Sequence, residues 1–82
     1  MGRFMRKKEN RMVISFHTTT EAVAMEEAAR KDGIDGRIIP LPTVISAGCG
    51  LAWSAPEEKG REILGYMKEK GLIYEKAGIY FI

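Results

Sequence analysis

The 82-residue sequence is poor in the side chains that build cross-links and metal sites. It contains one cysteine, Cys49, and one histidine, His17. A single cysteine cannot form a disulfide within the chain, and these two residues fall short of the four ligands that zinc prefers. We therefore expect neither a metal nor a cofactor.

Long hydrophobic runs are also absent from the sequence. No apolar stretch approaches the ~20 residues that a membrane-spanning helix needs. The apolar stretch Met12–Phe16, which follows a basic N-terminal segment, is shorter than the ~7–15 residues of a signal peptide, and no small-residue cleavage site follows it. We therefore expect a cytoplasmic protein with no membrane partner.

Positive charge is concentrated at the beginning of the chain. The net charge is +2, and residues 1–10 hold four of the basic side chains against one acidic side chain. Residues 11–82 carry nine basic and ten acidic side chains, so the folded part has no excess of basic residues. Because a nucleic-acid binder needs a basic face on its fold, we expect no nucleic-acid partner. We interpret residues 1–10 as a basic flexible tail and residues 11–82 as a single domain; contact of the tail with an anionic partner is the alternative.

The first half of the domain predicts a strand, a helix and a second strand. Apolar residues alternate with others from residue 12 to residue 16, which is typical of a strand. Thr18 stands three residues before Glu21, the spacing of a capping box, and Gly33 follows the basic end of the expected helix. The second strand is expected over residues 34–41.

The second half repeats these signals. Pro40 and Pro42 predict that the second strand is short and lies at a sheet edge. Residues 51–53 give a third short strand. Ser54, three residues before Glu57, predicts the start of a second helix, whose buried stripe and end are expected at Gly60, Ile63, Leu64, Met67 and Gly71. The final strand is expected over residues 72–82, interrupted around residues 77–78.

This β-α-β-β-α-β order predicts an α+β fold. The economical packing is a ferredoxin-like sandwich, with a four-stranded antiparallel sheet and both helices on one face. Another α+β sandwich, with the last strand paired differently or exchanged within a dimer, is the alternative. In the ferredoxin-like order the third strand lies beside the first. His17, the helix start at residues 18–20 and the loop that carries Cys49 should then meet at one end of the sheet.

That neighbourhood would favour a reactive thiolate at Cys49. Gly48 and Gly50 leave the sulfur open and allow backbone N–H groups to point at it. The positive end of the first helix and a protonated His17 would lower the pKa of the thiol, and Ser46 could donate a hydrogen bond to the sulfur. A lowered pKa turns a cysteine into a nucleophile at neutral pH.

Simpler interpretations stay open for the same residues. A lone cysteine is often a small buried hydrophobe, and His17 could lie on the polar face of its strand or beside a helix cap. The chain would then be a non-enzymatic interaction or oligomerisation module with an inert Cys49. In that case the apolar end of the last strand, at Ile79, Tyr80, Phe81 and Ile82, would pair between the subunits of a homodimer.

Several segments of the sequence resemble a known family. The segments ISFHTTTEAVAMEEAARKDGI, RIIPLP, GCGLA, APEEKGREIL and GIY are similar to small bacterial selenium/sulfur (Se/S) carrier-like proteins, and the resemblance covers residues 11–82. Its most specific element is Ile39-Pro40-Leu41-Pro42, followed by Cys49-Gly50-Leu51. The cysteine of the family falls on Cys49.

The resemblance implies a carrier that holds sulfur or selenium on Cys49 as a persulfide-type adduct. It implies donor and acceptor proteins as partners, and a carrier or binding protein more than a turnover enzyme. A lone cysteine suits this role, because a second nearby thiol would displace the cargo by forming a disulfide. The sequence departs from the family at Thr43, where a basic residue commonly follows the second proline.

Overall fold

The computed structural model describes residues 8–46 and 48–82. Most of the predicted tail, residues 1–7, lies outside the described residues. At the end of that tail, Asn10 begins the first strand. Glu9 and Ile82 exchange two backbone N–H···O hydrogen bonds of 3.0 Å each, so the strand pairing extends to Glu9.

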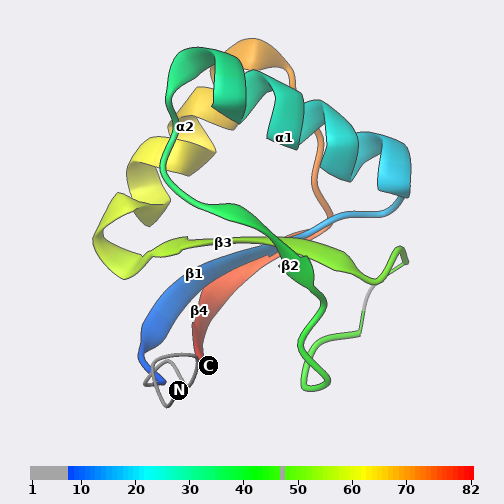
Figure 1. Ribbon diagram of the computed structural model, residues 1–82, viewed down its shortest axis with the longest axis vertical. Coiled ribbons are helices and arrows are strands. Elements are labelled where there is room, and N and C mark those ends of the chain that lie inside the picture. Colours follow the sequence, from blue (N-terminus) through cyan, green and yellow to red (C-terminus); the bar gives the residue numbers. More distant parts are fainter. Residues whose placement is uncertain (1–7, 47) are drawn as a thin grey trace, which may run out of the picture.

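The fold is a four-stranded sheet covered by two helices. In chain order the elements are β1 (Asn10–Ser15), α1 (Thr19–Asp32), β2 (Arg37–Pro40), β3 (Leu51–Pro56), the short 3-10 turn η2 (Glu57–Lys59), α2 (Gly60–Lys70) and β4 (Lys76–Phe81). All paired strands are antiparallel and their order is β2-β3-β1-β4. Both helices lie over the same face of the sheet (Figure 1). The predicted α+β fold is confirmed. Among the described residues, no helix has the length and apolar character needed to cross a membrane.

The main core lies between the sheet and the helices. Alternate residues of β1 and β3 point toward the helices, and α1 and α2 add apolar side chains from above. Together they form one buried cluster: Met12, Ile14, Phe16, Ala22, Met25, Ala29, Trp53, Ala55, Ile63 and Met67. Alanines on α1 allow the helix to approach the sheet closely. Burying each large apolar side chain contributes about 1.5–3 kcal/mol relative to leaving it exposed.

A smaller cluster lies on the opposite face of the sheet. Val13 and Ala52 are buried there against Ile45, which belongs to the loop between β2 and β3. Leu41, from the start of the same loop, packs on this cluster. The loop that carries Cys49 is therefore anchored by apolar contacts on the face that the helices leave uncovered.

The ends of α1 follow the sequence signals closely. The Thr18 hydroxyl accepts a hydrogen bond from the Glu21 N–H at 3.2 Å, as a capping residue should. The Glu21 carboxylate accepts from the His17 N–H at 2.7 Å, one residue before the position that a standard capping box uses. Gly33 ends the helix with a left-handed φ of +69°.

The predicted capping role of Ser54 is wrong. Ser54 lies inside β3, where its buried hydroxyl accepts a hydrogen bond from Arg11 Nε at 2.8 Å. The strand runs on to Pro56 because its pairing with β1 continues to the Arg11–Pro56 pair. As a result α2 begins through η2, without a side-chain cap, and the expected likeness between the two helix starts is lost.

The last strand also differs from the prediction. It begins at Lys76 instead of residue 72, because Gly71 turns the chain and the Leu72 N–H returns to the Met67 carbonyl at 2.9 Å. It continues without interruption through Gly78, which pairs with Val13 of β1. The second strand covers Arg37–Pro40, which is less than the expected residues 34–41. It is a short strand at a sheet edge, as Pro40 and Pro42 predicted.

Candidate functional site

Three segments meet at one end of the sheet: the end of β1, the start of α1 and the loop before β3 (Figure 1). Strand β3 lies beside β1, and Ser15 is opposite Ala52. Gly48 lies so close to the His17 backbone that a Cβ on the glycine would overlap the His17 carbonyl oxygen. The predicted meeting of His17 with the cysteine loop is therefore present at the level of the backbone.

Cys49 stands two residues before β3, at the edge of the main core. It is half-buried and packs against the helix-side cluster. Its thiol lies 3.6 Å from the Leu51 carbonyl oxygen and donates to it. The cysteine is thus neither enclosed like a core residue nor fully exposed, and its flanking residues Gly48 and Gly50 are exposed.

Two residues at the start of β4 hold the cysteine loop. The Glu75 carboxylate accepts a hydrogen bond from the Gly48 N–H at 3.2 Å, and Lys76 Nζ donates to the Ser46 carbonyl at 3.2 Å. The Glu75 N–H in turn donates to the Ser15 carbonyl at 2.7 Å. Sequence reasoning missed Glu75 and Lys76, because no local pattern links them to a loop about 30 residues earlier.

His17 is directed to Glu21 and not to the cysteine. Its Nδ1 lies 3.0 Å from Glu21 Oε1, and its side chain is about half exposed. Within residues 8–46 and 48–82, no hydrogen bond joins His17 or Ser46 to the Cys49 sulfur. His17 and Ser46 therefore belong to segments at this end of the sheet, but among the described residues neither is hydrogen-bonded to the thiol.

The His17–Glu21 contact changes the acidity of the carboxyl group. Partial burial raises the pKa of Glu21, but hydrogen bonds from the His17 backbone and ring, the charge of His17 and the Thr18 backbone outweigh it. The net effect is a pKa below the ordinary value of 4.5. His17 and Glu21 therefore act as one unit at the start of α1, with the carboxylate kept ionised.

The described residues were also searched for clusters of metal-ligating side chains. In residues 8–46 and 48–82, no group of three or more histidine, cysteine, aspartate or glutamate side chains is arranged to hold a metal ion. The chemistry available at this end of the sheet is that of a half-buried thiol, a histidine–carboxylate pair and exposed backbone.

Comparison with protein families decides which family this architecture belongs to. The family model described as "Putative Se/S carrier protein-like" matches residues 11–79. The chain belongs to this family. The resemblance seen in the sequence is thereby confirmed, and the match runs from β1 into β4 and includes Cys49. Neither the curated proteins nor the solved structures give a match.

Proposed function

We propose that this protein carries sulfur or selenium on Cys49 as a persulfide-type adduct. The observation that carries the proposal is the Se/S carrier family match, which spans the only thiol in the chain. The position of Cys49 supports it, because the residue is half-buried in a loop whose neighbouring glycines are exposed. A donor can approach such a thiol, while the core beside it shields one side of the bound cargo.

The transfer needs only a persulfide donor. The Cys49 thiolate attacks the terminal sulfur of a donor R–S–SH, the S–S bond of the donor breaks, and R–S⁻ leaves and takes up the proton that Cys49 released. The products are R–SH and Cys49–S–SH, so there is no net oxidation. A donor with terminal selenium gives Cys49–S–SeH in the same way. The reverse step on an acceptor protein returns Cys49 to the thiol, which is the cycle of a carrier and not of a turnover enzyme.

Loading would rearrange the contacts of the loop. The Cys49 thiol donates to the Leu51 carbonyl, and a thiolate or an adduct without that proton loses this contact. Gly50, with φ of +71°, provides the turn into β3. In this proposal Gly48 and Gly50 give access to the sulfur, Ser46 and His17 assist from the same end of the sheet, and donor and acceptor proteins approach there.

The proposal also covers the fold of the chain and the cellular location of the protein. We infer a ferredoxin-like sandwich over a single domain of residues 11–82, supported by the strand order β2-β3-β1-β4 and by the helices on one face. We also infer a cytoplasmic protein without a nucleic-acid partner, since residues 11–82 have no excess of basic side chains. The cytoplasm keeps thiols reduced, which a carrier with a single cysteine requires.

Intact-mass measurement tests the carrier function. After incubation with a low-molecular-weight persulfide and removal of the donor, the wild-type protein should gain the mass of one sulfur atom. Cys49→Ser should gain nothing, because the chain has no other thiol. Circular dichroism should show that the variant is folded. An equal mass gain in Cys49→Ser, or none in the wild type, contradicts the proposal.

A homodimer through β4 is the second candidate function. On the helix side of this edge strand Ile79 is 44% exposed and Phe81 is 65% exposed. The other edge strand, β2, contains Pro40, which cannot donate to a further strand, whereas β4 contains no proline. An open apolar edge favours pairing with a second chain.

Light scattering at micromolar concentration separates this candidate from a monomeric carrier. A dimer that Ile79→Lys converts to a monomer would support pairing through β4, because a lysine at an edge disfavours strand addition. Val23→Lys, at an exposed apolar residue of α1, is the matched control and should leave the dimer intact. A monomeric wild-type protein counts against the interaction module.

A further inference from the structure

The stretch of chain around Cys49 carries no charge of its own. Residues 38–56, which include the cysteine loop and all of β3, contain no acidic side chain and no lysine, arginine or histidine. Charge near the thiol must therefore come from other segments of the fold. The start of β4 supplies it, because Glu75 and Lys76 are both hydrogen-bonded to the loop.

These two side chains contact neutral backbone groups. The Glu75 carboxylate accepts from the Gly48 N–H at 3.2 Å, and Lys76 Nζ donates to the Ser46 carbonyl oxygen at 3.2 Å. Among the described residues, no ion pair includes Glu75 or Lys76. The two charges therefore act on the loop without being neutralised by an ion pair in that part of the chain.

The Glu75 carboxylate is held close to the sulfur by the chain itself. Gly48 directly precedes Cys49, and covalent geometry keeps the Gly48 nitrogen within roughly 7 Å of the Cys49 sulfur. With the hydrogen bond added, the carboxylate lies within about 10 Å of the sulfur, which is the Debye length at 0.1 M salt. Lys76 contacts Ser46, which is farther from Cys49 along the chain, so the same limit is weaker for its ammonium group.

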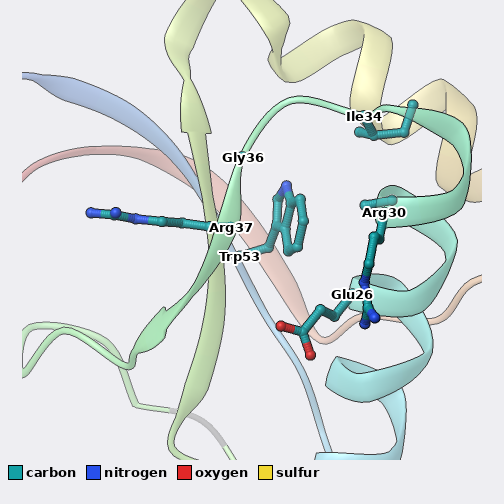
Figure 2. Close-up of a pocket in the computed structure, with 7 residues that line it drawn as sticks. Glu26, Arg30, Ile34, Gly36, Arg37 and Trp53 are labelled. Atoms are coloured by element: carbon teal, nitrogen blue, oxygen red, sulfur yellow. The ribbon is translucent and has the colours of Figure 1, made fainter.

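The neighbouring charges on α1 do not offset the Glu75 carboxylate. His17 and Glu21 lie 3.0 Å apart, and the lowered pKa of Glu21 keeps its carboxylate ionised at neutral pH. Farther along the helix, Glu26 and Arg30 line an open pocket beside Trp53 (Figure 2) and carry opposite charges. Neither set of residues adds net positive charge beside the thiol.

We propose that Glu75 is a specificity-determining residue of the Cys49 site, and that it selects donor and acceptor proteins with a basic side chain beside their reactive sulfur. Its carboxylate repels an anionic group that approaches the thiol and attracts a cationic one. A lysine or arginine of the partner can pair with Glu75 while the two sulfur atoms meet. The inference rests on the proposed carrier function, since it concerns the partners of that transfer.

Alkylation by two reagents of different charge measures this selectivity. Iodoacetate is an anion and iodoacetamide is neutral, and both react with the Cys49 thiolate. The ratio of their rate constants therefore cancels any change in the thiolate fraction or in the exposure of the sulfur. At about 10 mM ionic strength, Glu75→Gln should raise the iodoacetate/iodoacetamide ratio about two- to threefold, because it removes the repelling charge. A residue that only held the loop in place would not change this ratio.

The Glu75→Gln variant keeps the contact with the loop, since the glutamine side-chain oxygen can accept from the Gly48 N–H. Lys76→Gln should shift the ratio in the opposite direction. At about 1 M salt, where the Debye length is about 3 Å, both variants should return to the wild-type ratio. An unchanged ratio in Glu75→Gln at low salt would overturn the role of Glu75.

Glu58→Gln and Arg61→Gln are matched controls. Both residues are exposed and follow β3 at the end opposite Cys49. The six residues of β3 separate them from the cysteine by roughly 18 Å. These variants should keep the wild-type ratio, and a shift in Glu58→Gln equal to that in Glu75→Gln would also contradict the proposal.

Persulfide donors of opposite charge test the class of partner. Intact-mass measurements over time give the loading rates with cysteamine persulfide, which carries an ammonium group, and thioglycolate persulfide, which carries a carboxylate. The preference of the wild type for the cationic donor over the anionic one should fall about two- to threefold in Glu75→Gln. The alkylation ratios do not require loading. A protein that shows the expected ratios but never gains sulfur therefore contradicts the carrier function, whereas one that loads with equal ratios contradicts only the role of Glu75.

Discussion

Replacing Gly36 with alanine should lower the free energy of unfolding by about 3–5 kcal/mol, a large effect for the addition of one methyl group. A Cβ at this position would overlap Trp53 Nε1 and would lie 2.7 Å from the Ser54 carbonyl oxygen. Neither neighbour can move easily, because Trp53 is buried and Ser54 belongs to the centre of β3. The φ of +117° adds strain that only glycine avoids.

Urea unfolding followed by fluorescence and circular dichroism measures this loss, and Gly33→Ala is the matched control. Gly33 also has a left-handed φ, of +69°, but a Cβ there would meet nothing within 4 Å. The control should therefore lose only the roughly 1–2 kcal/mol that the left-handed conformation costs. Equal losses in the two variants would show that the approach of Gly36 to Trp53 does not limit stability.

The helices were largely predictable because their signals are local. The capping hydroxyl of Thr18 and the left-handed Gly33 act within one helical turn of the residues they stabilise. The buried stripe of α2 follows from helical spacing, and Ile63 and Met67 are buried as expected. A capping hydroxyl, a helix-ending glycine and a helical spacing of apolar residues can each be recognised within a short stretch of sequence.

The bounds of the strands could not be predicted from such short stretches of sequence. Ser54 and Glu57 have the spacing of a capping box, yet pairing of β3 with β1 extends the strand beyond Ser54. Hydrogen bonding to a strand about 40 residues away outweighs the local preference of a serine. In the same way, Gly78 was expected to interrupt the last strand, but the Tyr80 ring lies beside it within 3.3 Å of a Cβ position, and pairing to Val13 continues.

The candidate site was predictable in its location but not in its contacts. The element order was enough to place His17 and the Cys49 loop at one end of the sheet. The hydrogen bonds that join Glu75 and Lys76 to the loop depend on where β4 begins, and the sequence analysis placed that start four residues too early. Likewise, only the packing of β2 against α1 shows that Trp53 borders a pocket.

The contact between Gly48 and His17 links the stability of the loop to the accessibility of Cys49. Gly48→Ala places a Cβ against the His17 carbonyl oxygen and 3.2 Å from the His17 carbonyl carbon. Because these are backbone atoms, the loop must move away from β1, and the hydrogen bond from the Gly48 N–H to Glu75 is strained. We expect the free energy of unfolding to fall by about 1–3 kcal/mol. We also expect Cys49 to be alkylated by iodoacetamide about fivefold faster, since the loop opens more often.

Gly50→Ala separates the effect of this contact from a general effect of glycine loss. Gly50 lies on the other side of Cys49, with φ of +71° and nothing within 4 Å of a Cβ position. This variant should also lose about 1–2 kcal/mol, because alanine is strained in the left-handed region. Its loop keeps the approach to His17, so the alkylation rate of Cys49 should stay near that of the wild type. The two variants thus match in stability and differ in reactivity; equal alkylation rates would mean that the Gly48–His17 contact does not control access to the thiol.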